Sequence, residues 1–320
     1  MLSRVADSLY WTSRYLERAE HTVRLLDINL GLMLDKSHTS AERRWQRVLA
    51  ALGNPPHIAW DGDAFRLVQS LCFETASPAS VVNCIIAARE NARQIREEIS
   101  TEQWQRLNRL FHEVSSARSE RYSDLEFAEF LPAVIDGVHL FQGVTDTTLS
   151  HGEGWQFLQV GCSLERASAT ALLLDVYHRE VVRSPEEAVD AHEYLEWVGM
   201  LRSCTAFEAY CKVYTADLTY ERMLEFLLLN PDFPHSIRYS IDHLHRSLYA
   251  IQQESHQQNV DELMRVSGKL RTVLGYDQIS DVLAEDPGKY LRRILHECHR
   301  IHDLIYEAYI QYSVQTALAL

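Results

Sequence analysis

The segments LERAEHTVRLLDI at residues 16–28 and LERASATALLLDV at residues 164–176 decide how this chain is expected to fold. They align without a gap, and eight of their positions are identical. A weaker match follows each segment, because a Pro-x-Ser sequence at residues 78–80 recurs at residues 234–236, each time ahead of a new apolar run. The same landmarks in the same order predict an internal duplication whose seam lies near residue 150.

The surrounding sequence predicts helices throughout. Glycine (12) and proline (8) are scarce in the 320 residues, at about half their average usage, and this favours long helices over turns. Between residues 3 and 34, apolar residues recur every three or four positions, which is typical of one long helix. No alternating apolar and polar run indicates a strand. We therefore expect an all-α, duplicated helical bundle whose pseudo-symmetric halves, residues 1–150 and 151–320, pack as one body around two long central helices.

Charge and composition narrow the classes of partner. The formal net charge is -14 and the pI is about 5.5, so the average surface repels nucleic acid and acidic lipid headgroups. The six cysteines form no Cys-x-x-Cys pair, and no apolar run approaches the length needed to span a membrane. The N-terminal residues read as an amphipathic helix rather than as a signal peptide. We expect a cytoplasmic protein that binds neither nucleic acid nor membranes.

Two Glu-Arg (ER) pairs, Glu17-Arg18 and Glu165-Arg166, are the most informative polar residues. The second pair supplies the only charges between residues 154 and 174, in a segment that is apolar on every side and should be buried. A buried charge needs a partner, and neighbouring positions on a helix point about 100° apart, so the partners must lie on other helices. One arrangement fits the repeat: Glu17 pairs with Arg166, and Glu165 pairs with Arg18.

The ER residues admit three roles. They could form ion pairs that fix how the halves dock, or they could bind a carboxylate or amide of a ligand. A glutamate could also be a general base, although the sequence supplies no companion nucleophile. Elsewhere, Arg89 and Arg93 on one helix are candidates for an anion-binding site, although such clusters are commonly solvated faces. The spacing of His296-Glu297-Cys298-His299 does not fit a zinc motif, and we expect neither a metal nor a cofactor.

The motifs together resemble a known family. The opening MLSRVADSLYW at residues 1–11, SRYLERAE at 13–20, AARENAR at 87–93, EGW at 153–155 and LERA at 164–167 are similar to the bacterial Alpha-E family, a helical domain named for its Glu-Arg motif. The likeness covers essentially the full length, and the family is typically a tandem duplication. One departure is that Gly161-Cys162-Ser163 precedes the second motif where Ser13-Arg14-Tyr15 precedes the first, so two binding sites here would differ chemically.

The resemblance implies a role in a peptide synthesis or modification system. The partners it implies are an ATP-grasp carboxylate-amine ligase, a transglutaminase-like protein and an NTN-type peptidase, all suggested by genomic context. The leading expectation is a helical accessory or substrate-handling component that works with the ATP-grasp ligase and holds a peptide or amino-acid carboxylate near the ER helices. The alternatives are a non-catalytic structural interaction module and an autonomous amide-bond enzyme, so the sequence leaves open whether the chain is an enzyme.

Overall fold

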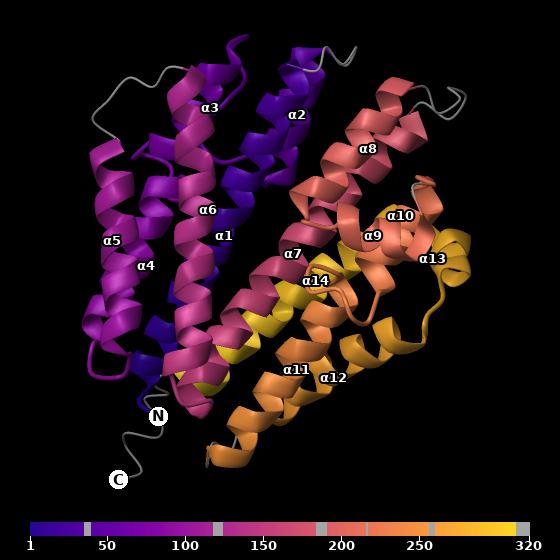
Figure 1. Cartoon of the computed structure of the whole chain (residues 1–320). Helices are drawn as coiled ribbons and strands as arrows, with labels where there is room; N and C mark the ends of the chain where they lie inside the picture. The colour runs from indigo at the N-terminus through magenta and orange to yellow at the C-terminus, as the bar shows by residue number, and fades with distance from the viewer. Residues whose placement is uncertain (35–39, 118–123, 184–190, 216, 256–259, 312–320) are drawn as a thin grey trace.

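The chain folds into helices alone in the parts that the structure describes. The computed structural model describes residues 1–34, 40–117, 124–183, 191–215, 217–255 and 260–311, and in them it contains fourteen α-helices, one short π-helix and no β-strand (Figure 1). The prediction of an all-α fold is confirmed, and so is the long helix predicted for residues 3–34.

Six helices make up the N-terminal half. They are α1 (Ser3–Leu34), α2 (Ala41–Ala51), α3 (Ala64–Phe73), α4 (Val81–Gln94), α5 (Thr101–Ala117) and α6 (Asp124–Thr148). The long helix α1 packs against both α4 and α6, and α5 packs across the same two helices. The helix α4 begins after Ser80, and α3 begins after Asp63, whose carboxylate accepts hydrogen bonds from the backbone amides of Phe65 and Arg66.

The C-terminal half contains more helices than the N-terminal half. It contains α7 (Glu153–Arg183), α8 (Ala191–Ser203), α9 (Phe207–Tyr214), α10 (Tyr220–Leu229), α11 (Ile237–Glu254), α12 (Asp261–Tyr276), α13 (Ile279–Glu285), α14 (Pro287–Ile305) and the π-helix Tyr306–Ile310. The helix α7 packs against α11 and α14, and α12 packs against both of these. The helix α11 begins after Ser236, whose hydroxyl accepts a hydrogen bond from the amide of Tyr239.

The helices α1 and α7 lie side by side at the centre and run in the same direction (Figure 1). Near their starts, the N-terminal ammonium group lies 2.8 Å from a carboxylate oxygen of Glu153, and further along Arg14 reaches Glu165. As the sequence predicted, α7 is buried on every side, since no residue from 157 to 178 is fully exposed. The two ER segments therefore meet along a shared, water-poor contact.

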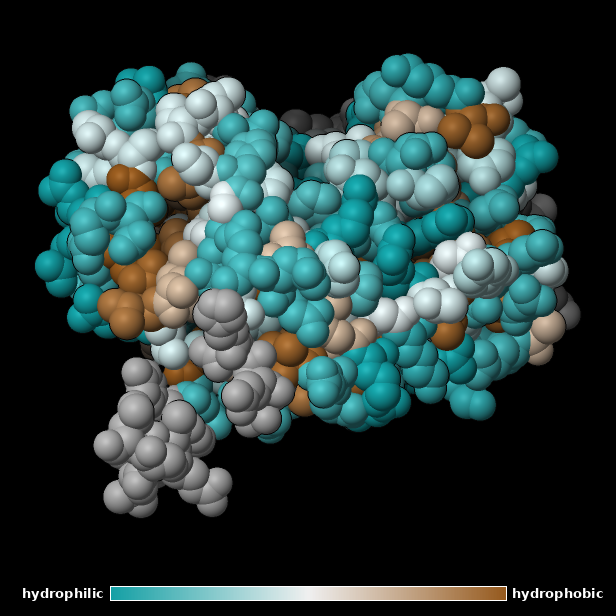
Figure 2. Space-filling view, turned by 90° about the horizontal axis from the view of Figure 1, so that it is seen from below, coloured by the Kyte–Doolittle hydropathy of each residue, from teal (hydrophilic) through white to brown (hydrophobic). Residues whose placement is uncertain are grey.

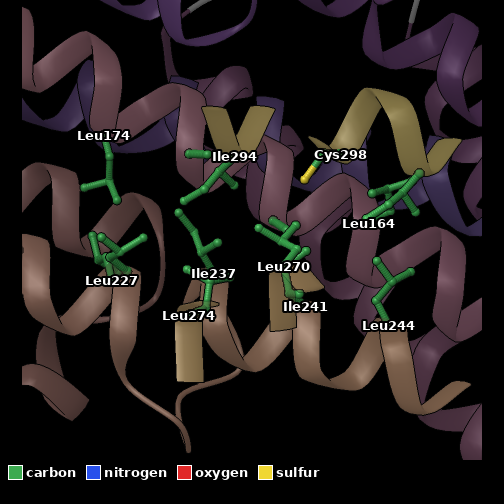
Figure 3. Close-up of a cluster of buried hydrophobic side chains, with 14 of the residues drawn as sticks. Leu164, Leu174, Leu227, Ile237, Ile241, Leu244, Leu270, Leu274, Ile294 and Cys298 are labelled. Carbon is green, nitrogen blue, oxygen red and sulfur yellow. The ribbon is translucent and has the colours of Figure 1, made fainter. Parts of the chain in front are cut away.

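Two apolar cores flank this contact. One lies inside the N-terminal half and is built from α1 to α6, and the other joins the first turns of α1 to the helices of the C-terminal half. Figure 3 shows part of the second core, where Leu164 and Leu174 of α7 face Ile237, Ile241 and other side chains of α10, α11, α12 and α14. Such burial stabilises the fold by about 25 cal/mol for each Å² of apolar surface removed from water.

The face of the molecule drawn in Figure 2 is mainly polar. Figure 2 shows one face on which hydrophilic residues predominate and hydrophobic patches are separate. Among the described residues, no helix combines the length and the apolar character needed to cross a membrane. The six cysteines form no disulfide bond, and four of them lie in the cores.

Candidate functional site

The four ER residues meet where α1 crosses α7. Glu17 and Arg18 lie in the middle of α1, and Glu165 and Arg166 lie in the middle of α7. Glu17 is only 2% exposed and Glu165 only 8%, so neither carboxylate relies on solvent for its hydrogen bonds. A buried carboxylate that lacks a partner would cost several kcal/mol, which makes the identity of each partner decisive.

Each motif glutamate pairs with the arginine of the other motif. Arg166 donates from Nε to Glu17 Oε1 at 2.5 Å and from a terminal nitrogen to Glu17 Oε2 at 2.8 Å. In the same way, Arg18 donates to the two oxygens of Glu165 at 2.7 and 3.1 Å. Both contacts are bidentate forks, the strongest geometry that an arginine makes with a carboxylate. The reciprocal pairing expected from the repeat is present in the structure.

A glycine allows the two helices to approach this closely. Gly161 of α7 lies directly against α1, and a methyl group added to it would collide with the hydroxyl of Ser13 and the carbonyl oxygen of Tyr10. Gly161 and Ser13 occupy matching positions, one turn before their ER pairs. The two helices therefore make contact at aligned positions of the two ER segments.

On the other side of the contact, Glu165 has two guanidinium partners. In addition to Arg18, the Nε of Arg14 donates to Glu165 Oε2 at 2.7 Å. Although burial alone would raise the pKa of Glu165, Arg14 and Arg18 lower it to about 2. The sequence did not single out Arg14, yet its position three to four residues before the ER pair places it on the same face of α1.

Arg14 also connects this contact to α14. Its guanidinium donates to the Tyr10 hydroxyl at 3.0 Å and lies 3.2 Å from Nδ1 of His302, to which the same hydroxyl donates at 2.7 Å. Arginine has no acceptor, so Nδ1 must be the unprotonated nitrogen of the ring. Burial, and then the charge of Arg14, lower the pKa of His302 to about 4, in agreement with a neutral ring.

The Glu17 side of the contact has weaker donors and a cavity. Besides Arg166, Glu17 Oε2 accepts from the Cys162 thiol at 3.0 Å and from the Gln142 amide at 3.4 Å. Burial raises the pKa of Cys162 well above its ordinary value, so the thiol stays protonated. A pocket of about 230 Å³ adjoins these groups, lined by Ser13, Leu16, Phe141, Gln142, Thr145, Asp146, Leu158, Gln159, Cys162 and Arg166.

The two sides differ because of one pair of matching positions. Arg14 and Cys162 both stand three residues before the motif glutamate. Arg14 reaches the carboxylate of the facing helix with a charged fork, whereas the short Cys162 side chain offers only a weak thiol donor. The sequence difference between Arg14 and Cys162 therefore gives Glu165 a second guanidinium partner, whereas Glu17 has one guanidinium partner and a pocket nearby.

A second buried ion cluster, which the sequence analysis missed, joins the halves further along α7. Arg44 and Arg47 of α2 both bond the carboxylate of Glu196 on α8, the first at 2.6 Å, and Arg47 also donates to Glu180 at 2.8 Å. The guanidinium of Arg47 lies 4.5 Å from the centre of the Tyr177 ring. The available signal was that both arginines fall on the apolar stripe of a short amphipathic helix.

The other candidates have local partners of their own. Arg93 is exposed and pairs with Glu90, while Arg89 donates to Asn108 and lies 4.3 Å from the centre of the Phe111 ring. An anion-binding site at these two arginines stays a prediction. Within the described ranges, no three histidine, cysteine or acidic side chains are grouped so that they could hold a metal ion.

Comparisons with known proteins agree with this geometry. The chain is 23% identical to an uncharacterized protein of Mycobacterium bovis and, at the same level, to uncharacterized proteins of Mycobacterium tuberculosis, over 77% of this chain. The chain spans 29% of the length of these relatives. No solved structure is significantly similar to it. Residues 1–310 match Alpha-E, described as a predicted alpha-helical domain with a conserved ER motif, and the ER residues are the ones paired at the centre of the fold. The chain therefore belongs to the Alpha-E family.

Proposed function

We propose that this chain is a helical accessory component of a peptide synthesis or modification system and works with an ATP-grasp carboxylate-amine ligase. In this proposal the ER pairs are structural and the chemistry occurs on the partner. The observation that carries it is the mutual pairing of Glu17 with Arg166 and of Glu165 with Arg18. All four charges already satisfy one another, so they hold α1 against α7 and are poorly placed to grip a substrate.

The same pairing argues against an autonomous amide-bond enzyme that uses these glutamates. A general base works best when its pKa lies near the working pH, and the pKa of Glu165 is lowered to about 2. Cys162 is a protonated thiol and therefore a weak nucleophile. A transglutaminase-like protein or an NTN-type peptidase of the same system is a further proposed partner, and the need for ATP favours a cytoplasmic setting.

The relatives support a role beside other protein segments. Their matched region is 29% of each chain, so a body like this one is joined to much additional polypeptide in those proteins. Joining two units in one chain keeps them at a high effective concentration, which favours their working together. The ligase itself is proposed from the family resemblance.

We also propose that the halves, residues 1–150 and 151–320, arose by duplication. The support is a matching set of neighbours: α1 packs against α4 and α6, and α7 packs against α11 and α14. The helix α5 packs across its pair as α12 does across the other. Equivalent points also meet at the contact, since Ser13 lies against Gly161.

A reconstituted reaction tests the accessory role. The chain would be combined with an ATP-grasp carboxylate-amine ligase from the same organism, with ATP and a panel of amino acids, and both ADP release and product masses would be measured. We expect products only when the ligase is present and a faster or more selective reaction when the chain is added. Product made by the chain alone would refute a non-catalytic role, and ligase kinetics unchanged by the chain would refute the partnership.

Substrate handling is a second candidate role, and one observation favours it. The Glu17 side of the central contact adjoins a pocket of about 230 Å³, whereas a purely structural clamp needs no such space. Typical sites for drug-sized molecules occupy about 300–1,000 Å³, so this pocket suits a single side chain or a small functional group.

A further inference from the structure

Another pocket lies on the outer side of the C-terminal half, between α11 and α12 and away from the ER contact (Figure 1). Its volume of about 540 Å³ falls within the range of about 300–1,000 Å³ that is typical of small-molecule sites. Arg238 and Asp242 line it one turn apart on α11, and Arg271 and Gly275 line it one turn apart on α12. Each of the two helices therefore contributes an arginine to the same space.

The arginines around this pocket outnumber the carboxylates paired with them. Asp242 is shared, because its Oδ1 accepts from Nε of Arg271 at 2.5 Å and its Oδ2 lies 2.8 Å from a terminal nitrogen of Arg246. Arg238 forms no ion pair with any described residue, and it donates to the backbone carbonyl oxygen of Leu229 at 3.3 Å. Three guanidinium groups are thus matched by one paired carboxylate, in a chain whose net charge is -14. This local excess of positive charge favours an anion.

Donors remain available on both lining arginines. Asp242 uses the Nε of Arg271, and among the described residues nothing accepts a hydrogen bond from its two terminal nitrogens, on a side chain that is 47% exposed. Gly275 leaves the wall of the pocket open, since nothing lies within 4 Å of a methyl group added to it. An oxyanion can therefore bond Arg238 and Arg271 without breaking an existing ion pair.

A neighbouring pocket of about 380 Å³ adjoins this space through Arg238, which lines both. Phe226 and Leu229 give the neighbouring pocket an apolar wall, and Glu225 and Asp277 add carboxylates. Those carboxylates repel a second negative charge, whereas the apolar side chains favour a hydrocarbon group. The two pockets together suit a molecule with an oxyanion at one end and an apolar body at the other.

We propose that Arg238 and Arg271 bind an oxyanion, a carboxylate or phosphate group, in the pocket between α11 and α12. Guanidinium groups are well suited to this role, because their planar forks match both anions. The body of the ligand lies in the adjoining pocket against Phe226 and Leu229, so a carboxylate with an apolar body, such as the C-terminal residue of a peptide, fits both spaces. This site is separate from the ER contact and does not rest on the ligase partnership.

Titration of simple probes into the intact chain tests the proposal. The probes are N-acetylleucine, its uncharged amide and inorganic phosphate, each followed by calorimetry. We expect saturable one-to-one binding of N-acetylleucine with a dissociation constant in the millimolar range, as for other ligands of this size, and no saturable binding of the amide. Phosphate identifies the source of the anion: affinity equal to that of N-acetylleucine assigns the site to free oxyanions, and weaker affinity assigns it to a carboxylate with an apolar body.

Two substitutions should change the affinity in opposite directions. Arg238→Gln removes the arginine that has no ion pair and should weaken binding of N-acetylleucine at least about tenfold. Asp242→Asn removes the carboxylate that competes for Arg271 and should strengthen binding several-fold. Arg93→Gln, which changes an exposed arginine on α4, is the matched control and should leave the affinity unchanged. A general loss of structure would not produce this pattern.

A third variant tests the space instead of the charge. Gly275→Val places a branched side chain in the pocket without meeting another residue, and it should abolish binding while the fold is retained. Equal affinity for N-acetylleucine and its amide, no saturable binding of either anion, or wild-type affinity in folded Arg238→Gln would each refute the oxyanion site. Because the titrations use this chain alone, failure here leaves the ligase partnership standing, and failure of the ligase reconstitution leaves this pocket standing.

Discussion

The two motif arginines act on carboxylates that they do not neighbour in sequence. Arg166 lies beside Glu165 on α7 but bonds Glu17 on α1. In the same way, Arg18 lies beside Glu17 on α1 but bonds Glu165 on α7. Adjacent helical positions diverge by about 100°, so an internal pair could not form while both side chains remained buried. The specificity of the contact therefore comes from the facing helix.

Truncating one of these arginines should be costly. We expect Arg166→Ala to lower the free energy of unfolding by about 3 to 5 kcal/mol, because Glu17 would keep only neutral donors in a buried site. Urea denaturation measures this change. As a control, Arg93→Ala removes an exposed pair with Glu90 and should leave the midpoint almost unchanged.

Acid should weaken the contact through Glu165. Its pKa falls from 4.5 in the unfolded chain to about 2 in the fold, so its contribution is fully present above pH 4.5 and is lost as the pH falls through 2. That shift corresponds to about 3 kcal/mol. Denaturation between pH 5 and 2 should show this loss in the wild type, whereas Glu165→Gln, less stable at neutral pH, should lack that part of the slope. If the free energy of unfolding of Glu165→Gln fell with decreasing pH as steeply as that of the wild type, the assignment of this acid sensitivity to Glu165 would be wrong.

Much of this residue-level picture could be predicted from the sequence, and the failures have a clear physical cause. Glu165 and Arg166 are the only charged residues in an apolar segment, so the sequence predicted that each needs a partner on another helix. The repeat predicted that these partners are the residues of the other ER pair. The roles of Arg14 and Cys162 depend on α1 and α7 being parallel and in register. That relative placement cannot be derived from the sequence of either helix alone. Arg47 was missed because its partner Glu196 is distant in sequence, although its place on an apolar stripe was visible.

At the scale of elements, the close crossing of α1 and α7 depends on Gly161. Periodicity predicted α1, and the apolar character of residues 154–174 together with the repeat predicted α7, but the separation of the two helices is set by the absence of one side chain. Bringing backbones this close allows the arginine forks to reach across without passing through solvent. Gly161 lies one turn before Glu165, and the space that its missing side chain leaves is taken by Ser13 and the Tyr10 carbonyl of α1.

Adding a methyl group at this crossing should separate the helices. We expect Gly161→Ala to destabilise the fold by roughly 1 to 3 kcal/mol, because the new carbon would meet Ser13 and the Tyr10 carbonyl. Gly143 of α6 is the matched control, since nothing lies within 4 Å of an added methyl group there. Thermal denaturation measures both variants. Gly143→Ala should stabilise the fold by about 0.5 to 1 kcal/mol, because alanine has a higher helix propensity than glycine.

At the scale of the whole molecule, charged contacts and apolar packing cross the middle of the fold together. The second core includes Val5, Leu9 and Tyr10 of α1 along with the helices of the C-terminal half. The Arg47 cluster ties α2 to α7 and α8 at another point. Neither half can therefore open along this contact without exposing buried charge and apolar surface.

The molecule should therefore unfold as one cooperative unit. Hydrogen exchange in increasing denaturant, followed by mass spectrometry, should give the same global opening free energy for α4 in one half and α11 in the other. Two separate opening energies, with one half exchanging while the other stays protected, would show that the central contact is weaker than its geometry indicates.

A pair of double-mutant cycles tests the reciprocal ER contact most directly. Glu17→Gln and Arg166→Met, singly and together, should give a coupling energy of about 2 kcal/mol, because the two side chains share a buried fork. The same cycle between Glu17 and its sequence neighbour Arg18→Met should give less than about 0.5 kcal/mol. Equal couplings in the two cycles, or the larger value for the neighbours, would contradict the pairing across α1 and α7.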